Sequence, residues 1–262
     1  MTVVQNPLIS MVVPYYRQPA MLMKQLETWG SYPSEVTDRM VFIVVDDGSP
    51  EPAEAVLNKY AAGPIRSGWP GVALLRIDVD IPWNRGCARN LGTKLATTPW
   101  VMHVDTDHVL PEPSAISLVR KVSALPINAF YRFRRYRVGK ADETRRKDSL
   151  DPNCEFGEIK PHIDSYLCTP DAYWKAGGYN EDFSGILGGG SPFLAEMIKA
   201  HGEPKVLPEC LHVHTRHSVP DSSENTLPRS PEAFARRKRE ILAKRGTLRG
   251  HNPVRCPWHR VR

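Results

Sequence analysis

The chain has 262 residues and a net charge of +6, with 41% hydrophobic and 24% charged residues. This composition is typical of an ordinary folded domain and excludes a disordered or fibrous chain. The sequence pI of about 9.1 favours anionic partners such as nucleotides, nucleic acid, acidic glycans or a membrane surface.

The five cysteines are scattered, odd in number and without a CxxC spacing. This pattern predicts neither a zinc site nor a disulfide framework, and it favours a reducing cytosol. No apolar run reaches the ~20 residues of a membrane span, and the N-terminus lacks the features of a signal peptide. We therefore expect a cytoplasmic protein without a transmembrane segment.

Short apolar runs alternate with helical patterns in the first part of the chain. The runs predict strands at residues 8–13, 40–45, 72–77 and 100–104, and the patterns between them predict helices at 19–32, 51–60 and 87–96. This alternation predicts a doubly wound, mostly parallel sheet of the α/β class. Ligands bind such sheets beyond the carboxyl ends of the strands.

After Pro111 the pattern is looser, and basic residues become frequent. Residues 129–138 alternate aromatic and basic side chains, which predicts either an anion-binding strand or an ordinary half-buried strand. Further predictions are a polar loop-rich stretch at 143–164, helices at 171–176 and 192–201, a glycine-rich stretch at 177–191, a mobile connection at 219–231 and a helix at 231–245. The basic tail to Arg262 is either a solvated surface or a site for a polyanion.

Two acidic motifs follow predicted strands. Asp105 and Asp107 come directly after residues 100–104, and two carboxylates spaced in this way can bind a divalent cation that bridges a nucleotide diphosphate. Asp46 and Asp47 come after residues 40–45, where a carboxylate can bind the base or the ribose of a nucleoside. The alternative for either pair is a solvated or structural turn, with Gly48 at positive φ in the second.

A third motif, Asn84-Arg85-Gly86-Cys87-Ala88-Arg89-Asn90-Leu91-Gly92, combines two glycines that permit close approach with Arg89, which can reach a phosphate. In order and spacing, these motifs resemble those of family-two glycosyltransferases with the GT-A fold. The resembling stretches are MVVPYYRQPAMLMKQLETW, FIVVDDGSP, NRGCARNLG, WVMHVDTDHVLP and the later GGYNEDF.

The resemblance implies a GT-A domain at residues 1–218, with a nucleotide-sugar-binding half at 1–111 and an acceptor half at 112–218. Residues 219–262 would be a linker, a helix and the basic tail. It also implies roles for individual residues: nucleotide-sugar binding by Pro14, Tyr16, Asp46, Asp47, Arg89 and Asp105, and coordination of Mn²⁺ or Mg²⁺ by Asp105, Asp107 and His214. The implied donor is a UDP-sugar.

One departure from the family concerns the general base. Inverting relatives carry an acidic pair at the end of the glycine-rich stretch, but here the stretch reads Gly188-Gly189-Gly190-Ser191-Pro192. Glu181 and Asp182 are the candidates for the catalytic base, with Asp164 more distant in sequence. A retaining mechanism or an impaired enzyme are the alternatives.

Three functions are therefore compatible with the sequence. The first is metal-dependent transfer of a sugar to the hydroxyl of a glycan, lipid-linked or small acceptor. The second is transfer to hydroxylated bases of DNA, because the basic tail suits DNA or an acidic glycan. The third is a non-catalytic module that binds nucleotides or nucleic acid.

Overall fold

A computed structural model describes residues 6–63, 71–138, 158–222, 229–251 and 254–262. The strands form one mixed sheet in the order β10-β3-β2-β1-β4-β8-β6-β9-β5, with β7 paired to β6. The strands are β1 (Ile9–Tyr15), β2 (Met40–Asp46), β3 (Val72–Ile77), β4 (Trp100–His103), β5 (His108–Val109), β6 (Tyr131–Val138), β7 (Glu158–Ile159), β8 (Tyr166–Cys168), β9 (Lys205–His214) and β10 (Trp258–Arg260).

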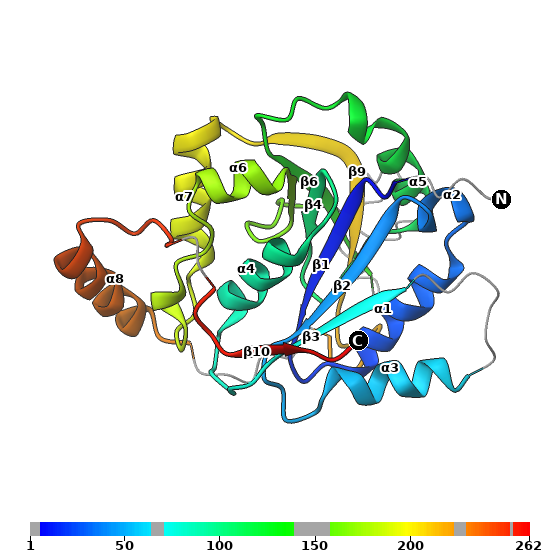
Figure 1. Cartoon of the computed structure of the whole chain (residues 1–262), viewed down its shortest axis with the longest axis horizontal. Coiled ribbons are helices and arrows are strands. Elements are labelled where there is room, and N and C mark those ends of the chain that lie inside the picture. The colour runs from blue at the N-terminus through cyan, green and yellow to red at the C-terminus, as the bar shows by residue number, and fades with distance from the viewer. Residues whose placement is uncertain (1–5, 64–70, 139–157, 223–228, 252–253) are drawn as a thin grey trace.

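Helices cover both faces of this sheet (Figure 1). The α-helices are α1 (Pro19–Ser31), α2 (Ser34–Thr37), α3 (Ala53–Ala61), α4 (Arg85–Leu95), α5 (Glu112–Lys121), α6 (Pro170–Lys175), α7 (Gly190–His201) and α8 (Pro231–Arg245). Two 3-10 turns, η1 (Val122–Ala124) and η2 (Glu181–Phe183), complete the set.

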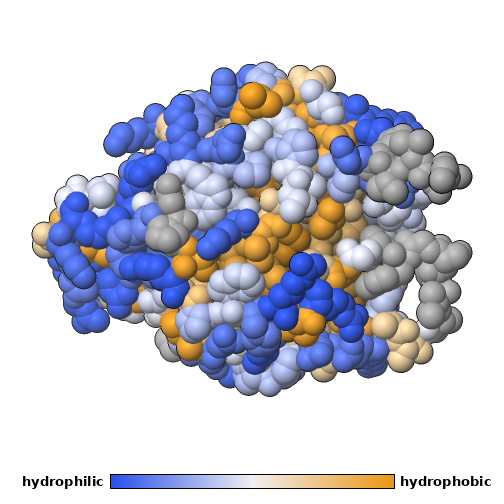
Figure 2. All heavy atoms as spheres, in the orientation of Figure 1, coloured by the Kyte–Doolittle hydropathy of each residue, from blue (hydrophilic) through white to orange (hydrophobic). Residues whose placement is uncertain are grey.

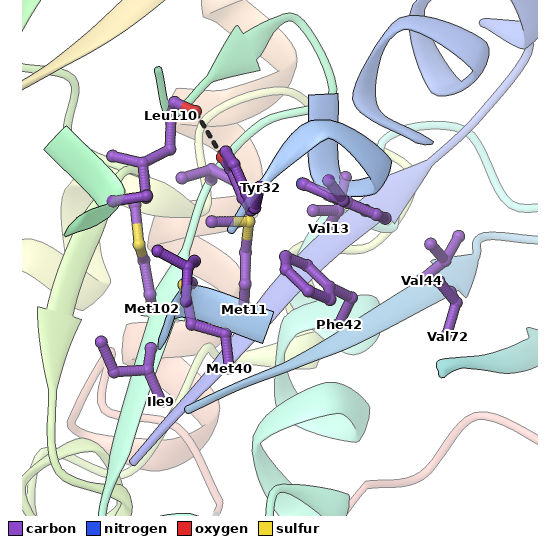
Figure 3. Packing of buried hydrophobic residues seen from close by; sticks show 14 of the residues in the cluster. Ile9, Met11, Val13, Tyr32, Met40, Phe42, Val44, Val72, Met102 and Leu110 are labelled. Carbon is purple, nitrogen blue, oxygen red and sulfur yellow. Dashed lines mark hydrogen bonds between the residues drawn. The ribbon is translucent and has the colours of Figure 1, made fainter. Parts of the chain in front are cut away.

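The strands β3, β2, β1 and β4 are parallel, and their alternate residues face two separate cores. On one face, Met11 and Phe42 pack with helices α1, α2, α3 and α5, and Tyr32 donates a hydrogen bond to the carbonyl of Leu110 within this core (Figure 3). On the other face, Val12 and Ile43 pack with α4, α6 and α7. Burial on both faces explains why these strands are continuous apolar runs in the sequence.

The predicted strands and helices of the first 111 residues are all present. The turn after β2 also has the predicted conformation, because Gly48 has a φ of 68°. Gly92 lies so close to Val12 that a β-carbon there would clash with the Val12 side chain, which lets α4 pack tightly on β1.

The elements that were not predicted include α2, β5, α5, β7, β8, most of β9 and β10. Much of the predicted loop at 143–164 and of the connection at 219–231 lies outside the described residues. The predicted strand at 129–138 is β6, in which Tyr131, Phe133 and Tyr136 are buried. A β-bulge between Phe133 and Arg134 shifts the register, so that the arginines on both sides of it remain at least partly exposed.

The cysteine pattern predicted no disulfide framework, and the described residues contain one disulfide that it did not indicate. Cys87 on α4 is joined to Cys256, although 169 positions separate them in the sequence. The two residues meet because the C-terminal segment returns to the sheet, where β10 pairs antiparallel with β3. The cysteine argument for a reducing compartment therefore fails for this pair.

Helix α8 lies at one end of the molecule, where hydrophilic residues cover the surface (Figures 1 and 2). Ser230 caps it by accepting a hydrogen bond from the Ala233 amide at 3.1 Å, and Gly246 ends it with a φ of 68°. Ile241 is its buried residue, whereas Arg236, Lys238, Arg239 and Lys244 are exposed. Among the described residues, no helix is long and apolar enough to cross a membrane.

Candidate active site

A cavity of about 860 Å³ opens beside the carboxyl ends of the parallel strands. Asp105 and Asp107, which follow β4, contribute its two carboxylates. Its lining also includes the arginines Arg85, Arg135, Arg137, Arg216 and Arg229. A wall with more cationic than anionic side chains is suited to an anionic ligand such as a diphosphate.

Asp105 is the centre of an ion-pair cluster. Arg89 Nη2 contacts its Oδ1, while Arg85 Nη1 and His162 Nδ1 lie 3.6 and 3.5 Å from its Oδ2. Burial opposes ionisation of this carboxyl, but Arg89, His162 and Arg85 outweigh it and hold the pKa of Asp105 well below its usual range. The Asp105 side chain is therefore a carboxylate at neutral pH.

Asp107 and the next residue, His108, form the second part of the site. His108 Nδ1 lies 2.7 Å from Asp107 Oδ1, and Arg135 Nη1 donates to His108 Nε2 at 2.9 Å. Because a guanidinium can only donate, the proton of a neutral His108 ring lies on Nδ1 and points at Asp107. Arg135, Asp107 and His108 are thereby held together across β5 and β6.

These residues also form the candidate metal group. Asp105, Asp107 and His108 each offer a ligand atom, and the three atoms lie within 4.8 Å of one another. Carboxylate oxygens are the ligands that Mg²⁺ and Mn²⁺ prefer, so this donor set fits the predicted cation. His108 was not among the predicted ligands, although its position directly after Asp107 was visible in the sequence.

His214, the predicted metal histidine, lies at the end of β9. Its backbone amide donates to the Asp107 carbonyl at 2.9 Å, and its Nδ1 lies 3.1 Å from Ser218 Oγ. Burial, with Lys24 nearby, lowers the pKa of His214 to about 4, so the ring is neutral at pH 7. Among the described residues, the candidate metal group contains His108 in its place.

Asp46 and Asp47 have different surroundings. Asp46 accepts hydrogen bonds from the amides of Ser49 and Ala53 at 2.8 and 2.9 Å and pairs with Arg76 at 2.6 Å, so it orders the turn between β2 and α3. Asp47 Oδ1 accepts from Asn84 Nδ2 at 2.9 Å. Burial raises the pKa of the Asp47 carboxyl well above its usual value, against the opposing effect of Asn84. Asp47 is thus a buried carboxyl beside α4.

Pro14 and Tyr16 lie at the carboxyl end of β1, as predicted. The Pro14 carbonyl accepts from Thr106 Oγ1 at 2.5 Å, which connects β1 to the segment between Asp105 and Asp107. The Tyr16 hydroxyl donates to Asp80 Oδ1 at 2.9 Å. Two nearby non-glycine residues have positive φ, Arg17 at 52° and Trp83 at 55°. Such backbone strain is common around binding sites.

The two predicted bases point to the C-terminal segment. Glu181 accepts from Asn90 Nδ2 at 2.8 Å and from the Arg255 amide at 2.9 Å. Asp182 contacts Arg255 at 2.7 Å, His251 at 3.1 Å and Arg245 at 3.4 Å. Burial opposes its ionisation, but Arg255 and His251 lower the pKa of Asp182 to about 2.

Neither carboxylate lines either of the two described cavities. This arrangement does not support Glu181 or Asp182 as the base, because each is occupied by groups of the C-terminal segment.

A second, much smaller cavity of about 20 Å³ adjoins the first, sharing Trp83, Arg85 and Leu187 with it. Arg89 and Asp164 line it together with the glycine-rich segment Gly188–Gly190. Sequence reasoning gave Asp164 little weight because it is far from the other motifs along the chain. It lies here because the turn before β8 faces the start of α7.

Comparison with known proteins agrees with this description. The model of Glycosyl transferase family 2 matches residues 10–186, which is more than half of the chain. No curated protein sequence gives a significant match.

Solved structures with a similar fold include S. aureus TarS, with a TM-score of 0.60 and 14% identity over 90% of this chain and 39% of TarS. Residues 1–349 of TarS in complex with UDP-GlcNAc give a TM-score of 0.58 and 15% identity, covering 90% of this chain and 66% of that one.

The mannosyltransferase PcManGT from Pyrobaculum calidifontis, in complex with GDP-Man and Mn²⁺, gives a TM-score of 0.53 and 15% identity, covering 97% of this chain and 66% of PcManGT. The chain thus spans between 39% and 66% of the length of these three structures. At such identities the similarity concerns the fold, which is that of GT-A glycosyltransferases, as predicted. The match over residues 10–186 goes further: this chain belongs to glycosyl transferase family 2.

Proposed function

We propose that this chain transfers a sugar from a nucleotide-diphosphate sugar to an acceptor hydroxyl, in a reaction that depends on Mn²⁺ or Mg²⁺. The observation that carries the proposal is the position of Asp105, Asp107 and His108 in the arginine-lined cavity of a family-two chain. A diphosphate would find cationic side chains there, with a cation-binding donor set beside it.

The nucleoside would lie over the ends of β1 and β2, with Pro14, Tyr16 and Asp47 around it. Asp46 would act indirectly, because its oxygens already hold the turn that carries Asp47. Arg89 would keep Asp105 ionised and oriented. We propose a UDP-sugar as the donor, which the UDP-GlcNAc complex of the structurally similar TarS supports by analogy.

Asp105 and Asp107 would hold the cation. His108 would join them only if its ring released Asp107 or Arg135, which occupy its two nitrogens, and the His214 amide supports the Asp107 backbone. When bound, such a cation supplies charge neutralisation for the departing nucleoside diphosphate. The protein's own part is to orient both carboxylates: Arg89 fixes Asp105, and His108 fixes Asp107 through a bond of 2.7 Å.

We propose two classes of acceptor. The exposed basic residues of α8 support a polyanionic acceptor such as DNA or an acidic glycan, whereas a small glycan would not need them. A non-catalytic nucleotide-binding module remains the third alternative, since the glycine-rich stretch carries no carboxylate.

A panel of nucleotide sugars, each incubated with the chain and Mn²⁺ or Mg²⁺, tests the proposal. Mass spectrometry should detect the nucleoside diphosphate and a glycosylated acceptor, with hydroxymethylated DNA among the acceptors offered. We expect EDTA and Asp107→Asn to abolish turnover, while Glu112→Gln on the exposed start of α5 should leave it unchanged. Full turnover in EDTA would contradict metal dependence, and binding without turnover would favour the non-catalytic module.

A further inference from the structure

The glycine-rich stretch has no carboxylate of its own, but the carboxylate of Asp164 lies next to it. A β-carbon built on Gly190, at the start of α7, would lie 2.9 Å from Asp164 Oδ2 and clash with Asp164 Oδ1. Asp164 therefore occupies the volume that an acidic side chain at position 190 would fill. We propose that Asp164 is the general base that accepts the proton of the acceptor hydroxyl. This inference rests on the proposed function.

The position of Asp164 relative to the donor site is fixed by one guanidinium group. Arg85 Nη1 lies 3.6 Å from Asp105 Oδ2, and Arg85 Nη2 lies 3.8 Å from Asp164 Oδ2. The guanidinium of Arg85 thus lies between the carboxylates of Asp105 and Asp164. A base must lie this close to the donor, because the acceptor oxygen attacks the sugar carbon next to the diphosphate.

The surroundings of Asp164 hold its carboxylate in one orientation. The Tyr179 hydroxyl donates to Oδ1 at 2.7 Å, and the residue is only 3% exposed. Arg132 donates to the carbonyls of Pro161 and His162, which anchors the turn before Asp164. Because the Tyr179 hydroxyl donates to Oδ1, the proton of the acceptor would go to Oδ2, which lies 3.8 Å from Arg85 Nη2.

A hydroxyl group or a water molecule can reach this side chain where the two cavities adjoin. Asp164, Gly189 and Gly190 line the smaller cavity, and Trp83, Arg85 and Leu187 line both. The glycines leave the space next to the carboxylate without side chains. A hydroxyl that enters from the larger cavity would approach Asp164 past Arg85, which lines both cavities.

The step that follows balances without a further reactant. The acceptor O–H bond breaks and its proton moves to the Asp164 carboxylate. The acceptor oxygen forms a bond to the anomeric carbon, and the bond from that carbon to the phosphate oxygen breaks. The electron pair leaves with the nucleoside diphosphate, and attack from the opposite side inverts the anomeric configuration.

Donor hydrolysis tests this role without knowledge of the acceptor, because water is then the nucleophile. The probes are UDP-GlcNAc, UDP-glucose, UDP-galactose and GDP-mannose with Mn²⁺, and the readouts are kcat for nucleotide release and the donor Kd from calorimetry. Asp164→Asn should lower kcat by ~100-fold or more while changing the donor Kd less than about threefold. Asp171→Asn, an exposed aspartate on α6, is the matched control.

The comparison of kcat with donor Kd separates a base from a structural residue, because a base acts only in the transfer step. An Asp164→Asn variant that is folded, binds the donor and keeps more than about a tenth of the wild-type kcat would overturn the assignment. A wild-type chain that hydrolyses none of the donors would overturn both this inference and the proposed function.

A positional swap addresses the geometry directly. The double variant Asp164→Gly/Gly190→Asp returns the carboxylate to the start of α7, and it should be at least tenfold faster than Asp164→Gly alone. A folded, donor-binding double variant no faster than Asp164→Gly would reject the idea that the two positions share one catalytic volume.

Discussion

The guanidinium of Arg89 and the carboxylate of Asp105 form an ion pair at the carboxyl edge of the sheet, and the Arg89 side chain is only 1% exposed. Arg89 lies on α4 and Asp105 follows β4, so the pair joins a helix to the strand end that carries the acidic motif. The charge of each partner is stabilised mainly by the other, because little water reaches them.

Replacing Arg89 should therefore be costly. We expect Arg89→Met to lower the free energy of unfolding by about 3–5 kcal/mol, because it leaves the Asp105 carboxylate buried with weaker partners. Urea denaturation measures the change. Arg120→Met is the matched control, since its pair with Glu35 is exposed and should contribute at most ~1 kcal/mol. Equal stability of Arg89→Met and wild type would show that Arg85 and His162 suffice for Asp105.

Asp47 and Asp46 should differ in what they affect. Leaving a buried hydrogen-bonding group without its partner costs about 1–3 kcal/mol, so Asp47→Asn, which replaces one acceptor oxygen by a donor, should weaken UDP binding by roughly tenfold. Asp46→Asn should chiefly lower stability, because its oxygens bind Arg76 and two backbone amides. Calorimetry with UDP and urea titration of both variants distinguish the two roles. Unchanged UDP affinity in Asp47→Asn would remove this residue from the nucleoside site.

The disulfide should contribute to stability by attaching the C-terminal segment to α4. Closing a loop of 169 residues restricts the unfolded chain, so reduction should lower the free energy of unfolding by about 2–4 kcal/mol. Urea denaturation with and without a phosphine reductant measures this. A Cys87→Ser/Cys256→Ser variant, which keeps the buried thiols Cys168 and Cys210, should not respond to the reductant. A wild-type midpoint that does not move on reduction would contradict the prediction.

The pKa of Asp182 predicts acid sensitivity of the same segment. A carboxyl with a folded pKa of about 2 stabilises the fold above its unfolded value of roughly 4, and this contribution is lost as the pH falls toward 2. Asp182→Asn should thus be less stable by about 1–2 kcal/mol at pH 7 and should approach wild type near pH 2. Urea titrations across this range, with Asp171→Asn as the control, measure the difference. A constant difference at every pH would show that charge is not the cause.

The basic face of α8 should govern affinity for a polyanion. Replacing Arg236, Lys238, Arg239 and Lys244 by glutamine should weaken binding to duplex DNA and reduce the slope of log K against log salt by up to ~3–4. The control replaces four exposed lysines elsewhere, Lys59, Lys94, Lys175 and Lys199, which alters the net charge equally. If both sets weaken DNA binding equally, overall charge rather than α8 is responsible. Truncation after Gly246 would be a poorer test, because it removes β10 and the disulfide.

The sequence by itself determined the first half of the fold and the nature of the site. Strands buried on both faces are recognisable as apolar runs, and each ligand-binding motif lies directly after one of them, so local order along the chain placed Asp47, Asp105 and Asp107 at one edge. The family motifs are local for the same reason.

Only the tertiary structure decided which residues from distant segments meet. Asp164 lies against Gly190, Cys256 bonds to Cys87, and Glu181 and Asp182 bind the C-terminal segment instead of facing a cavity. None of these contacts has a signature along the chain, because each depends on where a loop or strand returns to the sheet. Packing of the whole domain decides where these segments lie. It therefore also decides which of the carboxylates of Asp164, Glu181 and Asp182 lies beside a cavity.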